Sequence, residues 1–223
     1  GLSVRSDPFR FGSDTFSVRG VGGNRVAVEV DGVPVAGGFA IGSFADSGRS
    51  FVDPAFLQRV EVLRGPASSM YGSDAIGGVV AMTTIEPQSL LGAGRDTGLR
   101  VSSGLTGVDD GWNAAATSAL RHGEWSGMLG YVHREGHEAA TAADVEPNPR
   151  DYRSDSWLAK LDFAAMPGGP LSLVLESGAV RQQTSIDAFL GLAGTGWVNT
   201  KQLERDDRRD RYRLGARKSL GGS

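Results

Sequence analysis

The stretch at residues 56–84 places the strongest constraint on the fold. An apolar run at 60–63 is followed by Pro66, which has no backbone donor, so a strand has to end before it. Pro66 suits the first position of a helical turn at 67–71, which the glycine after it can close. The β-branched run at 79–84 then predicts a buried strand. The stretch therefore predicts the order strand, turn, short helix, turn, strand.

A second patterned segment, at residues 16–35, comes before it. Alternating valines lead into Asp31-Gly32, a dipeptide typical of two-residue hairpin turns, and Pro34 places the return strand at a sheet edge. The glycines near residue 22 invite comparison with a dinucleotide-binding fingerprint. The third glycine of that motif would fall on Arg25, however, and a strand follows instead of a helix. The pattern therefore argues against a nucleotide site.

These two segments carry a family resemblance. The runs FSVRGVGGNRVAVEVDGVPV at 16–35 and RVEVLRGPASSMYGSDAIGGVVAMTT at 59–84 resemble the plug domain of TonB-dependent outer-membrane receptors. The run FVDPAFLQRVEVLRGPASSMYGSDAIGGVV at 51–80 looks closest to receptors of the haem and haemoglobin type. The resemblance implies a small α+β domain that fills the lumen of a transmembrane β-barrel.

Composition excludes several other classes of protein. Glycine makes up 33 of 223 residues, about twice the usual share, which favours strands and tight turns over helices. The net charge of -3 and interspersed charges argue against nucleic-acid binding. There is no cysteine, no apolar run long enough for a membrane helix, and no nucleophile elbow around Ser73. We therefore predict that the chain is not an enzyme and carries no cofactor.

The pattern changes beyond residue 84. Alternation is clearest where Trp157, Leu161 and Phe163 share one face and Lys160 and Asp162 the other, as expected for a wall between lipid and a polar lumen. Segment lengths fit the ~9–11 residues that a tilted strand needs to cross a bilayer. Six segments of this kind are predicted at about 99–107, 112–121, 125–135, 156–165, 171–182 and 207–217.

The sequence thus predicts a mainly β chain: a plug domain at 1–86, a linker at 87–98, and the N-terminal part of an antiparallel transmembrane β-barrel at 99–223. Connections after the second and fourth strands are short, and those after the third and fifth are long. Because outer-membrane barrels have short periplasmic turns, the chain is expected to enter the wall from the periplasm. Six strands cannot close a barrel of about 22, so we expect a fragment or trimmed form of a longer receptor.

Three residues of the long loop at 36–53 are candidate ligand contacts, because the resemblance implies that this loop rises to the top of the plug: Phe39, Phe44 and Arg49. The alternative is a plain linker. A loop of this length without secondary structure is either functional or disordered.

The resemblance also implies that Arg19 and Arg64, each before a glycine at a strand end, pair with glutamates on the barrel wall. Those glutamates would lie in strands that this chain does not contain, and Glu61 is the local partner that the sequence offers. The alternative is a pair of exposed strand-end arginines. We predict no metal site, with His137, in an external loop, as a weak candidate for a metal or haem-iron ligand.

The resemblance implies active uptake of an iron-containing nutrient, haem or a ferric siderophore, across the bacterial outer membrane. The expected partners are the TonB complex, through a segment absent from this chain, outer-membrane lipid and the ligand itself. A receptor of the same family for cobalamin or another nutrient stays open, as does a soluble all-β binding module. A passive porin would have no use for a globular plug.

Overall fold

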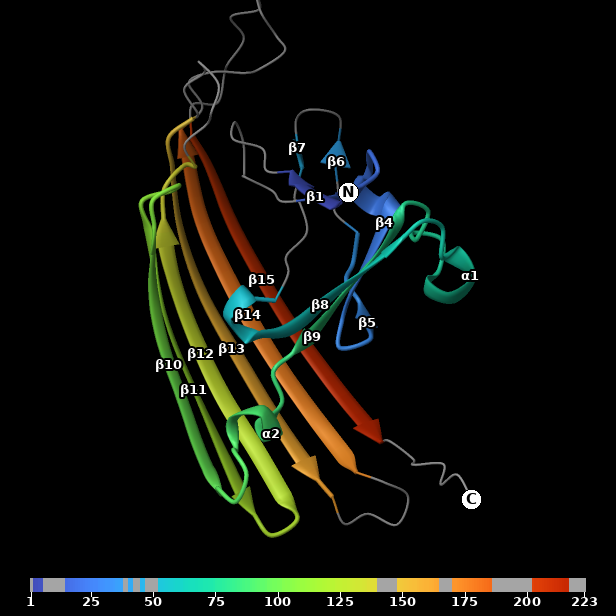
Figure 1. The fold of residues 1–223 in the computed structure, drawn as a ribbon. Helices are drawn as coiled ribbons and strands as arrows, with labels where there is room; N and C mark the ends of the chain where they lie inside the picture. Colours follow the sequence, from blue (N-terminus) through green and yellow to red (C-terminus); the bar gives the residue numbers. More distant parts are fainter. Residues whose placement is uncertain are drawn as a thin grey trace, which may run out of the picture.

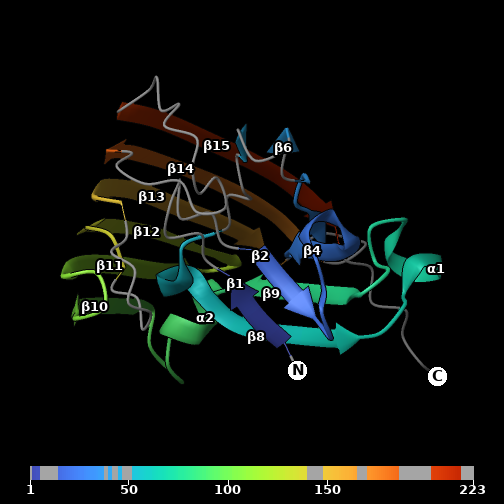
Figure 2. The same cartoon turned by 90° about the horizontal axis from the view of Figure 1, so that it is seen from above.

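The computed structural model describes residues 2–5, 15–37, 40–41, 45–46, 52–139, 148–164, 170–185 and 202–216. Its largest element is a six-stranded antiparallel sheet, the wall, in which each strand pairs with the next along the chain. Its strands are β10 (Thr97–Thr106), β11 (Gly111–His122), β12 (Trp125–Gly136), β13 (Arg150–Phe163), β14 (Leu171–Ser185) and β15 (Gln202–Ala216). The wall is curved, and the remaining elements lie on its concave side (Figures 1 and 2).

All six predicted wall strands are confirmed, but two begin earlier than the sequence suggested. β13 starts at Arg150 and not near residue 156, and β15 starts at Gln202 and not near residue 207. Their first residues are almost all polar, so they lack the apolar alternation that marks a half-buried strand. Strand pairing by backbone hydrogen bonds continues there without an apolar face.

Side chains alternate across the wall as predicted. On β13, Trp157 and Leu161 are exposed on the convex face, whereas Leu158 and Lys160 are buried on the concave face. Ring pairs lie at two levels of the convex face: Trp125 with Phe163 and Tyr131 with Trp157, at centroid distances of 4.5 and 4.4 Å. Six residues of β12 separate these levels, about 20 Å along a strand.

A four-stranded sheet in the order β5-β4-β9-β8 forms the centre of the plug. β4 (Val26–Val30) and β9 (Gly78–Thr84) are parallel neighbours whose valines are buried, as the β-branched runs predicted. β5 (Val33–Pro34) is an edge strand, as Pro34 required, and β8 (Leu57–Arg64) is the other edge. The smaller strands are β1 (Leu2–Arg5), β2 (Thr15–Val18), β3 (Val21–Gly22), β6 (Ala40–Ile41) and β7 (Ala45–Asp46).

The short helices lie where the prolines and glycines predicted turns, with two differences. α1 (Ser68–Tyr71) confirms the helical turn after Pro66. One difference is a single 3-10 turn, Pro54–Phe56, which ends where β8 begins at Leu57. The predicted linker contains α2 (Pro87–Leu90), with proline in the first turn where its missing donor costs nothing. A 3-10 turn, Gly23–Arg25, precedes β4.

α2 can lie close to the wall because residue 98 is glycine. A Cβ on Gly98 would lie 2.3 Å from the carbonyl oxygen of Leu90, closer than atoms can approach.

Among the described residues, no helix has the length and apolar character needed to cross a membrane.

Candidate functional site

The turn between β4 and β5 carries a buried carboxylate. Asp31 and Gly32 have φ angles of 51° and 76°, the left-handed pair that a two-residue hairpin turn requires. The Asp31 Oδ1 accepts a hydrogen bond from the backbone N–H of Thr84 at 2.8 Å, and Oδ2 accepts one from the Thr84 hydroxyl at 2.7 Å. A single turn residue therefore ties the hairpin to the end of β9.

Cations from two wall strands meet the same carboxylate. Arg211 of β15 places Nη2 3.2 Å from Asp31 Oδ2, and its Nη1 donates to the Val30 carbonyl at 2.6 Å. Lys160 of β13 places Nζ 4.0 Å from Asp31 Oδ2, and Arg213 Nη1 donates to the Asp31 carbonyl at 3.1 Å. The Asp31 and Lys160 side chains are 4% and 1% exposed, so this is a buried ion pair between the plug and the wall.

Two of these cations, Arg211 and Lys160, have a second acid within reach. Arg211 pairs with Glu176 of β14, a 2% exposed side chain that also pairs with Arg209. The Lys160 Nζ donates to Glu86 Oε1 at 2.8 Å. The buried charges are therefore shared among several partners, which offsets the cost of removing them from water.

A second ion pair joins the plug to the wall at the 3-10 turn before β8. Asp53 accepts from the Ala55 N–H at 2.8 Å, and Arg134 of β12 binds both of its oxygens, with Nε at 2.7 Å and Nη2 at 3.0 Å. Beside it, the buried Phe56 ring packs over Gly130, where a Cβ would lie 2.6 Å from Phe56 Cε1. A two-point guanidinium contact and a ring over a glycine fix the turn against β12.

The three residues predicted for the charge network lie elsewhere. Arg19 sits exposed in the turn between β2 and β3, and Arg64 is exposed at the end of β8. Glu61 pairs with Arg59 at 3.4 Å, with both side chains exposed. Within the described residues neither Arg19 nor Arg64 forms an ion pair, so their pairing with further strands stays a prediction. The candidate ligand contacts Phe39, Phe44 and Arg49 lie outside the described residues.

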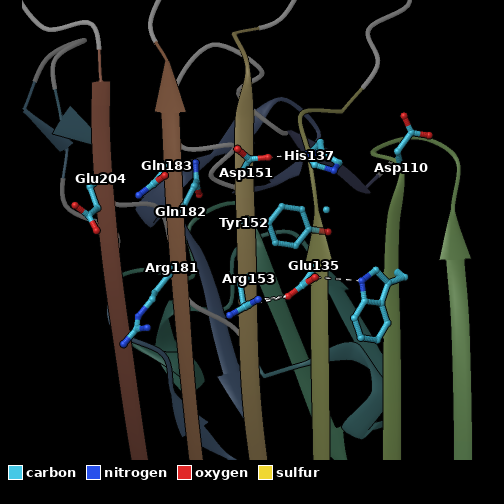
Figure 3. Close-up of a pocket in the computed structure, with 12 residues that line it drawn as sticks. Asp110, Glu135, His137, Asp151, Tyr152, Arg153, Arg181, Gln182, Gln183 and Glu204 are labelled. Atoms are coloured by element: carbon cyan, nitrogen blue, oxygen red, sulfur yellow. Dashed lines mark hydrogen bonds and ion pairs between the residues drawn. The ribbon is translucent and has the colours of Figure 1, made fainter.

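An open groove of about 430 Å³ lies at the end of the wall where β12 ends and β13 begins (Figure 3). Glu135 forms its centre, with the Trp112 indole N–H donating at 3.2 Å and Arg153 Nε at 2.7 Å. Trp112, Glu135, Arg153 and Arg181 are successive cross-strand partners, and Arg153 shares the convex face of β13 with Trp157. These central groups face away from the lumen, so we do not assign the groove to a transported ligand.

Two of the three histidines, His133 and His137, make local contacts with acids. His133 Nδ1 lies 2.8 Å from Asp155, and His137 Nδ1 lies 2.7 Å from Asp151 at the groove rim. The part of the chain that the structure describes holds no cluster of three His, Cys, Asp or Glu side chains able to bind a metal. His137 as a ligand of iron stays a weak prediction.

Sequence reasoning missed the residues that join the plug to the wall. Asp31 was interpreted only as a turn residue, Asp53 as the end of the loop at 36–53, and Lys160 as one member of a polar face. A signal was present, since Lys160, Glu176 and Arg211 are charged residues on the lumen face of strands at membrane depth. The pairing itself joins residues as far apart as 31 and 211, which no local pattern reveals.

Comparison with known proteins identifies this architecture. The family model described as TonB-dependent Receptor Plug Domain matches residues 1–79. A "Hemin receptor" of Yersinia pestis is 33% identical over 138 residues, covering 60% of this chain and 19% of the relative. The plug is therefore a TonB-dependent receptor plug domain. Members of this family are transporters and receptors.

Other TonB-dependent receptors agree with the assignment. "Lactoferrin-binding protein A" of Neisseria meningitidis is 30% identical over 141 residues, covering 60% of this chain and 15% of the relative. The solved structure of the FrpB iron transporter from Neisseria meningitidis matches with a TM-score of 0.61 at 22% identity, covering 82% of this chain and 27% of that one. At this identity the match shows the fold alone. The chain spans less than a fifth of the length of the hemin receptor.

Proposed function

We propose that the chain forms the plug and the first wall strands of a receptor that actively takes up an iron-containing nutrient across the outer membrane. In this proposal residues 1–86 are the plug, 87–98 the linker and 99–223 the first part of the barrel. The TonB complex supplies the energy, and the chain has no enzymatic role.

The observation that carries the proposal is the globular plug held on the concave face of the wall by buried ion pairs at Asp31 and Asp53. A passive pore gains nothing from such a plug, whereas a receptor that opens only under an applied force needs one. Similarity to a "Hemin receptor" favours haem as the cargo, and similarity to siderophore receptors at the level of fold keeps a ferric siderophore as the second candidate.

Growth of a receptor-deletion strain tests the cargo. The complete gene is restored, and haem or a ferric siderophore is given as the only iron source. Growth on haem that depends on both the receptor and TonB supports the proposal, and rescue on the siderophore alone would replace haem with the second candidate. Loss of rescue in a TonB-deleted strain separates active uptake from leakage.

The protein ligand for haem iron is a separate question, because residues 1–86 contain no histidine. His137 is the candidate on this chain, but its Nδ1 is 2.7 Å from Asp151 at the rim of the outward-facing groove. We therefore expect His137→Ala to leave growth on haem unchanged, with the ligand supplied by other loops of the receptor. We further propose that Phe39, Phe44 and Arg49 contact the cargo from the plug side.

A further inference from the structure

Two of the three wall cations that bind the plug at Asp31, Arg211 and Lys160, have a second acid on the wall side of the contact, whereas Arg213 binds the Asp31 carbonyl. Arg211 Nη2 lies between Asp31 and Glu176, and Glu176 is part of strand β14 itself. Lys160 Nζ lies between Asp31 and Glu86, 4.0 Å from the first and 2.8 Å from the second. Asp31 is thus one of two acids for each of these two cations.

Glu86, the last residue of the proposed plug, stays with the wall because it leads directly into α2. Gln88 of α2 donates to the Ser126 hydroxyl at 3.1 Å and to Asp162 at 3.3 Å, both on wall strands. α2 also packs against β10, β11 and β12. The hairpin of β4 and β5, in contrast, reaches the wall through Val30 and Asp31 at its tip.

The second acids determine whether a buried cation loses its only partner when the hairpin leaves the wall. Removing the only partner of a buried charge is strongly destabilising, because the remaining ion is neither hydrated nor paired. Here Arg211 keeps Glu176 and Lys160 keeps Glu86 after Asp31 has gone. Asp31 gives up its bonds to Thr84 and moves into water as a hydrated carboxylate, so neither Arg211 nor Lys160 loses its last carboxylate partner.

We propose that Asp31, Lys160, Arg211, Glu176 and Glu86 form a charge-exchange latch. In the closed state the cations are shared between the plug and the wall, and in the open state they pair with the wall acids alone. The latch lets the β4–β5 hairpin detach and return while Arg211 and Lys160 always keep an acid partner. The inference rests on the proposed function only in that cargo uptake requires the plug to move.

The latch predicts opposite effects for acids on its two sides. Asp31→Asn keeps hydrogen-bonding groups for Thr84 but removes the charge that attracts the wall cations, so the hairpin detaches more often. Glu176→Gln removes the second carboxylate that pairs with Arg211. Arg211 then pairs with Asp31 alone, so the hairpin is held more tightly. Glu86→Gln has the same sign through Lys160 and serves as the second variant if Glu176→Gln does not fold, since Glu176 also pairs with Arg209.

The test is hydrogen–deuterium exchange of peptides covering residues 28–35 in the complete receptor, purified in detergent. We expect about tenfold faster exchange in Asp31→Asn and slower exchange, by about threefold or more, in Glu176→Gln and Glu86→Gln. Arg181→Gln is the matched control: it removes an exposed ion pair with Asp206 on the outward face of β14 and is expected to change nothing.

If the five groups only stabilised the fold, removing any of the three acids would speed up exchange. Faster or unchanged exchange in both Glu176→Gln and Glu86→Gln therefore overturns the latch, as does unchanged exchange in Asp31→Asn. The measurement does not depend on cargo. Exchange that follows the expected pattern in a receptor without iron-dependent growth would retain the latch and reject the proposed function.

Discussion

At the residue scale, Asp31 and Asp53 each bind a group of the plug and a cation of the wall. Asp53 accepts the Ala55 N–H at the start of a 3-10 turn and also binds Arg134, and Asp31 closes a hairpin turn while it binds Arg211. Each carboxylate is held by another group of the plug: Asp53 by the Ala55 N–H two residues on, and Asp31 by Thr84 at the end of β9. An ion pair with one side fixed in advance loses less conformational entropy when it forms.

Arg134→Ala tests the contact at Asp53. The substitution leaves the buried Asp53 carboxylate with only the Ala55 N–H as a partner. We therefore expect the docking of the turn to weaken by about 2–4 kcal/mol. This is at or below the range for fully buried pairs, because Arg134 is itself a quarter exposed. Faster hydrogen exchange at residues 52–57 in the complete receptor would report this. The double variant Asp53→Asn/Arg134→Ala, which removes the stranded charge, should recover most of the loss. No recovery would mean that the charge is not the cause.

Arg64→Ala tests the pairing that the family resemblance implies. Arg64 is exposed at the end of β8 in this chain, and we propose that its partner is a glutamate on a wall strand beyond the six described here. Removing the arginine would leave that glutamate buried and unpaired, so exchange across residues 56–84 should rise while ligand affinity changes little. Unchanged exchange in the complete receptor would count against this role and favour a merely exposed strand-end arginine.

At the scale of elements, the sequence predicts strands well where one face must be apolar. β10, β11 and β12 lie within two residues of their predicted bounds, because Trp125 and Leu129 alternate with small or inward residues. The external ends of β13 and β15 were missed, because a strand outside the lipid needs no apolar face. The ion pairs that join plug and wall could not be predicted at all, since their partners meet only after the wall and plug have folded.

The connection between β12 and β13 carries a pH-dependent contact. Glu138 accepts the Arg150 N–H at 2.9 Å, and this bond holds the pKa of the Glu138 carboxyl below its ordinary value of 4.5. A lowered folded-state pKa means that the carboxylate stabilises the connection at neutral pH and that this stabilisation is lost as pH falls from about 4.5 through the folded value.

Protection of the Arg150 amide should therefore fall at acidic pH. Hydrogen exchange of peptides covering residues 148–152, corrected for the intrinsic effect of pH, would measure this. Glu138→Gln keeps an acceptor but cannot titrate, so its corrected protection should be flat over the same range. A wild-type profile as flat as that of the variant would exclude the contact as the cause.

At the scale of the whole molecule, the two faces of the wall have opposite requirements. The concave face is covered by the plug, including buried Lys160 and Glu176, whereas the convex face carries a continuous set of exposed apolar side chains that no other described element covers. These are Leu99, Val101, Leu105, Leu120, Trp125, Leu129, Trp157, Leu161, Leu175, Tyr212 and Leu214. A soluble binding module would have to cover this face with a second layer.

The chain is therefore expected to depend on a lipid-like environment. Exposed apolar surface of this extent drives association in water, since each square ångström removed from solvent contributes roughly 25 cal/mol. Purified residues 1–223 should aggregate without detergent and remain dispersed in it, as light scattering and size-exclusion chromatography would detect. Replacing Leu129 and Leu161, two outward leucines, with serine should reduce partition into detergent micelles, whereas Ser103→Thr, on the same convex face of β10 as Leu99, should not. A monodisperse, detergent-free form of the unchanged chain would overturn the assignment of the convex face to lipid.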